Sequence, residues 1–303
     1  MSDPRVAVVG TGRMGAAMAA RLRSCGADVV VHNRTRSKAT TVAAATGATM
    51  AETPREAAAG ADVVLVSLAD DAACAEAYGG EDGIVAGLSA SSVVADTSTV
   101  GPWTSRRLGA LVGERDAGML DAPVSGSVPV VERGELTVMV GGAADDLDRA
   151  RPVLDLLSGR IVHVGPTGAG ATMKLAVNSV VHALNQALTE ALVLAERSGV
   201  DRRTAYGIFA ASVVGGPFVQ YKRAAFEDPD RTPVAFSLDL VAKDLDLVLE
   251  LASQVGLTMR QAEVNRAAVA AAVAAGLGER DMSALAGVLR GMSGQRADVP
   301  NGS

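Results

Sequence analysis

A short apolar run followed by a glycine-rich turn constrains the start of this chain more than any other feature. Residues 5–9 are typical of a strand that is buried on both faces. The turn that follows reads Gly10-Thr11-Gly12-Arg13-Met14-Gly15 and opens an expected helix over about 13–25. In this context the glycines permit a tight turn, a close backbone approach to a pyrophosphate, and close helix–strand packing. The pattern therefore predicts a dinucleotide site at a helix N-terminus, with a glycine-rich turn that binds no ligand as the alternative.

The rest of the chain divides into two parts of different character. Further buried runs lie at 28–32, 63–66, 93–95, 136–140 and 161–164, with helical stretches between most of them. Such alternation predicts a mostly parallel sheet with helices on both faces. After 164 we expect only helices, the first over about 168–198 with Gly199 as its end. The others are expected at 202–211, 217–227, 237–255, 259–275 and 281–290, with Thr258, Asp281 and Ser237 or its neighbour as caps.

Composition bounds the class of protein. The 303 residues are 49% hydrophobic and 20% charged, which indicates a globular chain. A net charge of -6 gives no reason to expect nucleic acid. Two cysteines and three scattered histidines make a metal site or a disulfide framework unexpected. With no room for a signal peptide and no apolar run of about 18 residues, we expect a cytoplasmic protein that does not enter the membrane.

The end of the second expected strand bears on cofactor choice. An acidic residue about 20 residues after the glycines would hold a ribose hydroxyl and favour NAD. This chain has Asn33-Arg34-Thr35 there, and arginine binds phosphate in a bidentate manner. We therefore expect NADP (NADPH), with NAD as the weaker alternative. A surface arginine without a cofactor role is the other interpretation.

Lys174 is unusual in a chain that has 24 arginines and four lysines. It lies in the expected long helix just after a glycine run that includes Gly168 and Gly170, which we expect to let the helix start approach a ligand. Lysine, unlike arginine, can lose its proton and serve in acid–base chemistry. Asn178 is one turn further on and shares its face. A lysine with its stem on apolar surface and its head in water is an equally good interpretation.

Three further features have simpler alternatives. The segment 121–127 follows an apolar run, and Pro123 and Gly126 predict a turn at a strand end. His182 continues the stripe of Asn178, where a packed, hydrogen-bonded helix histidine is the favoured interpretation. Lys243 lies near Asp239 and Asp246 on an expected helix, so an intrahelical ion pair explains it without a function.

Together, four spaced motifs resemble the β-hydroxyacid dehydrogenase family, which includes 3-hydroxyisobutyrate dehydrogenase, tartronate semialdehyde reductase and glyoxylate/succinic semialdehyde reductase. They are Gly10–Gly15, Asp121–Gly126, the glycine run into Lys174 and Asn178, and Lys243-Asp244. The resemblance implies an N-terminal doubly wound Rossmann sheet, a long interdomain helix and a C-terminal all-α domain. The division would be 1–164 for NADP binding, 165–199 for the helix, 200–292 for substrate and dimerisation, and 293–303 as a flexible tail.

The resemblance also implies roles for single residues. Lys174 would be catalytic and Asn178 would support it; Lys243 would close over cofactor and substrate. Substrate contacts would come from Ser125, Gly126, Ser127 and Lys243. Cofactor contacts would come from Gly10, Thr11, Gly12, Arg13, Met14, Gly15, Asn33, Arg34, Thr35, Leu68, Ala69, Thr99 and Lys243.

The chain departs from the family pattern at Ser127, where a second glycine is usual, and at Ala69, where proline is usual. Imine reductases share the fold and the Asn-Arg-Thr signal but commonly lack the catalytic lysine. The expected function is thus NADP(H)-dependent interconversion of a short β- or γ-hydroxyacid and its semialdehyde or keto acid, in a homodimer or homotetramer. For that work Lys174 should titrate nearer neutrality than a free lysine. The alternatives are an imine reductase and a non-catalytic NADP-binding scaffold.

Overall fold

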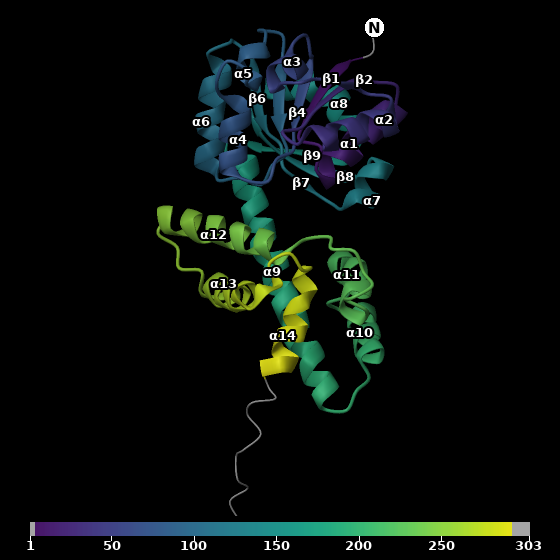
Figure 1. Cartoon of the computed structure of the whole chain (residues 1–303). Helices are drawn as coiled ribbons and strands as arrows, with labels where there is room; N and C mark the ends of the chain where they lie inside the picture. Colours follow the sequence, from purple (N-terminus) through teal and green to yellow (C-terminus); the bar gives the residue numbers. More distant parts are fainter. Residues whose placement is uncertain (1–3, 293–303) are drawn as a thin grey trace, which may run out of the picture. The chain divides into compact units, whose positions relative to one another are not determined.

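The computed structural model describes residues 4–292. Its contacts divide the chain into two compact units, Met1–Leu175 and Ala176–Ser303. Figure 1 shows the strands gathered in the first unit and helices in the second. The predicted fold class, a parallel sheet followed by a long helix and a helical region, is confirmed.

The first unit contains a nine-stranded sheet in the order β3-β2-β1-β4-β5-β6-β8-β7, with β9 beside β8. Pairing is parallel except that β8 runs antiparallel to β6 and β7. The strands are β1 (Arg5–Val9), β2 (Asp28–His32), β3 (Thr49–Met50), β4 (Val63–Val66), β5 (Val93–Asp96), β6 (Gly118–Asp121), β7 (Val124–Ser125), β8 (Leu136–Gly142) and β9 (Ser158–Gly165). The prediction did not include β3 and β7, because a two-residue strand has no readable period.

Helices cover both faces of this sheet. Along β1, Val6 and Val8 join one buried cluster, whereas Ala7 and Val9 join another. That alternation follows from the two-residue period of a strand and confirms the predicted doubly wound arrangement. The helices are α1 (Arg13–Ser24), α2 (Arg36–Thr46), α3 (Pro54–Ala58), α4 (Asp71–Tyr78), α5 (Ile84–Gly87), α6 (Pro102–Gly113), α7 (Val128–Arg133) and α8 (Ala144–Leu157).

The long helix α9 (Ala169–Arg197) matches the predicted range of 168–198. It is continuous through the boundary at Leu175 and Ala176. At 1.5 Å per residue its length is about 44 Å. Gly199 follows it with φ of 92°, a conformation that glycine adopts without penalty, so the predicted end is confirmed.

The second unit is helical throughout its described part. Its elements after α9 are α10 (Arg202–Ala211), α11 (Pro217–Glu227), α12 (Leu238–Gln254), α13 (Arg260–Ala272), a π turn (Val273–Leu277), a 3-10 turn (Met282–Ala284) and α14 (Leu285–Met292). Ser237 and Asp281 are N-caps as predicted, accepting from the backbone N–H groups of Leu240 and Ser283. The cap predicted at Thr258 is wrong, because Met259 is the residue that precedes the first helical position of α13.

The last two predicted helices are shorter than expected. Gly276 has φ of 83° inside the π turn, which breaks the helical backbone, and residues 282–284 are wound as a 3-10 turn. The predicted tail at 293–303 lies outside the described residues. Within residues 4–292, no helix combines the length and the apolar character needed to cross a membrane.

Candidate functional site

The glycine turn after β1 is shaped by two glycines that pack and one that does not. Gly10 has φ of 97°, and a Cβ on it would lie 2.2 Å from the carbonyl oxygen of Ser67. A Cβ on Gly15 would lie 1.9 Å from the carbonyl oxygen of Gly10. A Cβ on Gly12 would meet nothing within 4 Å. The sequence therefore leaves open space directly in front of α1.

The N-terminus of α1 fits a nucleotide pyrophosphate. No side chain caps it, so its first N–H groups are available to an anion. The hydroxyl of Thr11 is buried and lacks a hydrogen-bond partner in the described structure. Arg13 is exposed, and Met14 packs on the core beside the sheet. A bound diphosphate would accept hydrogen bonds from the uncapped N–H groups of α1 and from the Thr11 hydroxyl, in the space that Gly12 leaves open.

Asn33 connects the turn to the end of β2. Its Oδ1 accepts a hydrogen bond from the Thr11 backbone N–H at 3.0 Å, and its Nδ2 donates to the Thr35 carbonyl at 3.1 Å. Arg34 projects outward with 78% of its side chain exposed, and its Nη1 lies 2.8 Å from Oε2 of Glu76 on α4. Such an exposed pair is worth little, so a phosphate could displace the glutamate.

The ends of β4 and β5 are tied together beside the same turn. The Leu68 N–H donates to Oγ of Ser98 at 2.9 Å. Asp96 accepts from the Ser98 N–H at 2.9 Å and from the Tyr78 hydroxyl at 2.8 Å. Burial raises the pKa of Asp96, although the hydrogen bonds from Ser98 and Tyr78 oppose the rise. These contacts fix the backbone just before Ala69, which is exposed, and just before Thr99, which is half-buried.

Tyr78 was missed by the sequence reasoning, since a tyrosine at the end of a helix carries no motif. It is fully buried, and only the fold brings its hydroxyl to Asp96. Four of the predicted cofactor segments lie at the carboxyl ends of neighbouring parallel strands: Gly10–Gly15, Asn33, Leu68 and Ser98–Thr99. Ligands bind at this edge in open α/β sheets.

The predicted carboxylate-binding residues lie elsewhere in the sheet. Ser125 is on β7 opposite Thr137 of β8, and the sheet order separates β7 from β1 by four strands. The predicted turn is present, with Gly126 at φ of 146°. Ser127 stands at the N-cap of α7, where its side chain makes no cap hydrogen bond.

The start of α9 is held by an aspartate at the end of β6. The Asp121 carboxylate accepts from the backbone N–H groups of Gly168 at 2.8 Å and Ala171 at 2.7 Å. A Cβ on Gly170 would lie 2.3 Å from the Asp121 carbonyl oxygen. The expectation that Gly170 makes room for a ligand is therefore wrong, because the absent side chain makes room for the backbone of β6. Lys174, half-buried on the next turn of α9, is thereby fixed in register with β6.

The second unit holds a buried polar cluster around Asp244. Its Oδ2 accepts from Asn178 Nδ2 at 2.6 Å, and its Oδ1 lies 3.0 Å from Lys243 Nζ. The Nε2 of His182 lies 3.6 Å from the same Oδ2. Burial opposes ionisation of Asp244, but His182 and Lys243 outweigh it and hold the pKa of this carboxyl below its usual value. Asn178 thus has one fixed orientation.

Two sequence interpretations can be compared with this cluster. Lys243 does form an ion pair within its own helix, but with its neighbour Asp244, whereas Asp246 is bonded to Arg266 of α13 at 2.6 Å. His182 is packed, as expected, but neither ring nitrogen has a hydrogen-bond partner within residues 4–292; its contact with Asp244, at 3.6 Å, is that of an ion pair. The sequence signals for this cluster were the spacing of four between Asn178 and His182 and the Lys243-Asp244 motif.

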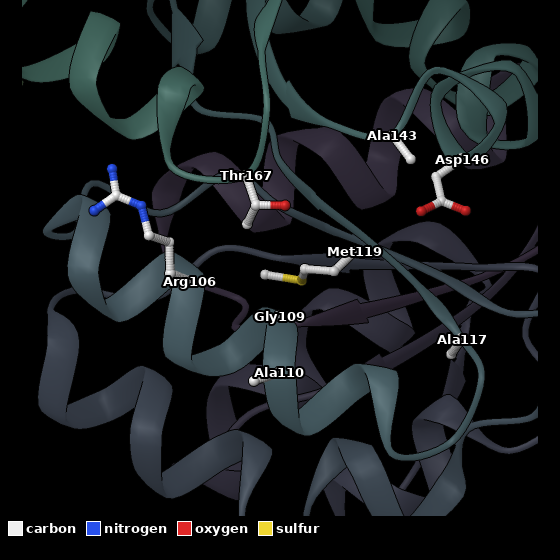
Figure 2. A pocket seen from close by; sticks show the side chains of 8 residues that line it. All are labelled: Arg106, Gly109, Ala110, Ala117, Met119, Ala143, Asp146 and Thr167. Carbon is white, nitrogen blue, oxygen red and sulfur yellow. The ribbon is translucent and has the colours of Figure 1, made fainter.

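Two cavities lie away from the predicted residues. Figure 2 shows one of about 350 Å³ in the first unit, with Met119 between Arg106 and Asp146. Its wall consists of Arg106, Gly109, Ala110, Ala117, Met119, Ala143, Asp146 and Thr167. The other, of about 470 Å³ in the second unit, is bordered by Arg202, Arg280 and Arg290. These arginines are already paired with Glu196 or Asp230.

Two family models cover nearly the whole chain. Residues 5–165 match the one described as the NAD binding domain of 6-phosphogluconate dehydrogenase. Residues 168–289 match the one described as "NAD-binding of NADP-dependent 3-hydroxyisobutyrate dehydrogenase".

Named relatives match over most of their length. The NAD-dependent L-serine dehydrogenase of Pseudomonas aeruginosa is 35% identical, over 82% of this chain and 85% of that protein. The 2-(hydroxymethyl)glutarate dehydrogenase of Eubacterium barkeri is 31% identical, over 96% of each. Among solved structures, the Mycobacterium tuberculosis 3-hydroxyisobutyrate dehydrogenase with L-serine aligns with a TM-score of 0.82 and 31% identity, over 95% of this chain and 100% of that one.

Proposed function

The chain belongs to the β-hydroxyacid dehydrogenase family, and from that premise we propose an NADP(H)-dependent enzyme acting on a short hydroxyacid and its semialdehyde or keto acid. The coarser statement, an oxidoreductase with a nicotinamide cofactor, follows from the family itself. The observation that carries the finer proposal is Asn178, an amide anchored by Asp244 one helical turn after Lys174.

In this proposal the first unit holds the cofactor through Gly10–Gly15, Leu68, Ala69 and Thr99. The N–H groups of α1 take the pyrophosphate, and Asn33 keeps the β2 end on the turn. Arg34 and Thr35 take the 2′-phosphate of NADP. The name of the L-serine dehydrogenase relative includes NAD, so NAD is the weaker second cofactor. When bound, the nicotinamide supplies the hydride chemistry.

Lys174 moves the proton. In reduction its ammonium donates to the carbonyl oxygen as negative charge develops there; in oxidation its neutral amine takes the proton of the alcohol. Asn178 orients the reacting oxygen with the second N–H of its Nδ2, because the other N–H is donated to Asp244 and fixes the amide. A fixed proton donor lowers the barrier because it needs no reorientation during the reaction.

The substrate carries a carboxylate or a similar anion. Ser125, Gly126, Ser127 and Lys243 are the residues that we assign to it. A glycine backbone beside two hydroxyls suits a small planar anion, and Ser127 adds a hydroxyl where related proteins usually have none. Two relatives are named for 2-(hydroxymethyl)glutarate and L-serine, both of which contain a hydroxymethyl group. A 3-hydroxyacid is therefore the first substrate to try.

We propose that the enzyme is a homodimer or homotetramer through its helical unit. Val180 and Leu194 of α9 are 66% and 69% exposed, and Ile208 and Val264 are each 60% exposed. Exposed apolar side chains in this number favour a protein partner. The division into 1–164, 165–199 and 200–292 and a cytoplasmic location stay predictions. Light scattering on the purified protein would contradict this part if it gave a monomer.

The decisive experiment is oxidation of NADPH and NADH against succinate, methylmalonate and tartronate semialdehydes, glyoxylate and one cyclic imine. L-serine and 3-hydroxyisobutyrate would test the reverse direction. We expect turnover of an acid-bearing substrate, faster with the phosphorylated cofactor. Lys174→Ala should lose about 10²- to 10⁴-fold in kcat while still binding NADPH, and Lys174→Arg should fail as well.

Other outcomes would select the rival functions. Turnover of the imine without a carboxylate requirement would indicate an imine reductase. Tight NADPH binding with no turnover would indicate a scaffold. A Lys174→Ala variant with near-native kcat would remove the catalytic assignment even if the substrate were right.

A further inference from the structure

The cavity of about 470 Å³ in the second unit has an excess of positive charge on its wall. Three arginines border it, from α10, from the segment before the 3-10 turn and from α14: Arg202, Arg280 and Arg290. Asp230 is the one acidic residue on the part of the wall that residues 4–292 form. Such a concentration of guanidinium groups is unusual in a chain whose net charge is -6.

Two carboxylates are bonded to these three guanidinium groups. Glu196, near the end of α9, accepts from Arg202 Nε at 2.6 Å and from Arg290 Nε and Nη2 at 2.6 Å and 2.8 Å. Asp230 accepts from Arg280 Nη2 at 2.6 Å. One positive charge is therefore left over, and each guanidinium has five N–H groups to donate. The wall favours an anionic ligand.

The two carboxylates differ in exposure. The Glu196 side chain is 16% exposed, whereas that of Asp230 is 82% exposed. An exposed ion pair contributes little free energy, so an incoming anion can replace Asp230 on Arg280 at low cost. Arg290 makes two of the three bonds to Glu196, so Glu196 keeps a cationic partner if Arg202 turns away. Arg280 and Arg202 are therefore the groups that can bind a ligand.

The cavity also has the size and the apolar surface that a small organic molecule needs. Its volume is within the range of about 300–1,000 Å³ that is typical of small-molecule sites. Phe226, which is buried, and Leu277 lie on its wall. The hydroxyl of Ser283, also on the wall, is already donated to the Ala225 carbonyl at 3.1 Å. Charge recognition therefore comes from the arginines.

We propose that this cavity binds a small organic dianion, either a phosphate ester or a dicarboxylate, through Arg280 and Arg202. Both kinds of anion match the planar fork of a guanidinium group. One charged oxygen pair of the ligand replaces Asp230 on Arg280, and the other end of the ligand accepts from Arg202. All residues of this site belong to the second unit. Binding stabilises that unit by mass action, and the site is separate from the proposed cofactor site.

Nitrogen–proton NMR of the deuterated full chain tests the proposal, because it locates binding at single residues. Glycerol 2-phosphate and glutarate are added in separate titrations, and sodium chloride keeps the ionic strength constant. We expect the backbone amide signals of Ser283, Ala284 and Gly287, all on the wall, to shift saturably with at least one of them. The tighter midpoint identifies the phosphate ester or the dicarboxylate as the ligand class. If neither dianion shifts these signals saturably, the proposal is wrong.

Three variants test the roles of single residues by changing the midpoint of this titration. Arg280→Gln should weaken binding by about tenfold, because a charged hydrogen bond at a partly exposed site is lost. Arg202→Gln should weaken it in the same direction, and Glu196 keeps Arg290 in this variant. Asp230→Asn should instead tighten binding a few fold, since it removes the competing carboxylate. A loss of folding would not produce tighter binding.

Arg266→Gln is the matched control. Arg266 also lies in the second unit and is paired with the exposed Asp246, but it is not on the cavity wall. Its replacement removes the same charge and should leave the midpoint unchanged. Equal weakening in Arg266→Gln and Arg280→Gln would show attraction by overall charge and overturn the site, as would weaker binding in Asp230→Asn. These outcomes do not depend on whether the protein is a dehydrogenase.

Discussion

The two candidate sites differ in how their polar groups are arranged. At the sheet edge of the first unit, the groups that would face the proposed cofactor are backbone N–H groups, and glycines shape the space around them. In the second unit, the polar groups are side chains held by one another: Asn178 by Asp244, and Asp244 by Lys243. We therefore expect an added side-chain atom to disrupt the glycine turn of the first unit, and the loss of one charged partner to disrupt the buried polar groups of the second.

The buried pair of Lys222 and Asp281 gives the largest expected effect and tests the second half of this comparison. Lys222 Nζ lies 2.9 Å and 2.8 Å from the two carboxylate oxygens, and the Asp281 side chain is 8% exposed. Lys222→Met leaves that carboxylate without its cation, so we expect a loss of about 3–5 kcal/mol in unfolding free energy, measured by denaturant unfolding.

Arg223→Met, next in the sequence, is the control for Lys222→Met. Its pair with Glu227 lies on the surface, with 48% of the arginine side chain exposed, so its loss should be below about 1 kcal/mol. Adding Asp281→Asn to Lys222→Met should recover part of the stability. Equal losses for Lys222→Met and Arg223→Met would show that burial does not set the strength of these pairs.

Two glycines of one turn test the first half of the comparison. In Gly15→Ala the new Cβ would lie 1.9 Å from the Gly10 carbonyl oxygen, and we expect about 3 kcal/mol of destabilisation. In Gly12→Ala the new methyl meets no protein atom within 4 Å. Stability should then hold, whereas NADPH affinity should fall because the methyl occupies the space in front of α1. Calorimetric unfolding and NADPH titration separate the two effects.

Arg34 tests whether a side chain adds binding energy for NADPH to that of the backbone N–H groups at the turn after β1. Arg34→Ala should weaken NADPH binding by about 2 kcal/mol, or roughly 30-fold, because a charged hydrogen bond to phosphate is lost. NADH binding should stay within about twofold, and so should NADPH binding in Glu76→Gln, which frees the arginine. If Arg34→Ala weakens NADH and NADPH equally, the NADP preference has another origin.

The same contrast explains what could be read from the sequence. The Gly10–Gly15 turn, the strand ends and the long helix follow from local patterns, and the structure has them within a few residues. The Asp244 cluster joins residues that are 66 positions apart, so local patterns mark its two halves but not their contact. The same holds for Tyr78 and Asp96, which meet only once α4 packs on the sheet. Gly170 was misinterpreted because a sequence cannot tell whether a glycine faces a ligand or the protein's own backbone.

Glu196 gives the smallest expected effect and tests the charge dependence by pH. Burial opposes its ionisation, but hydrogen bonds from Arg290 and Arg202 outweigh burial and hold the pKa of Glu196 below its usual value. A lowered pKa in the folded state contributes stability above the unfolded-state pKa of about 4.3, and this is lost as the pH falls through the folded-state value. Glu196→Gln should therefore be less stable than the native protein at pH 7, by up to about 1 kcal/mol. The difference should shrink as the pH falls below 4.3 in calorimetric scans, and a difference that grows on acidification would contradict the role of the two arginines.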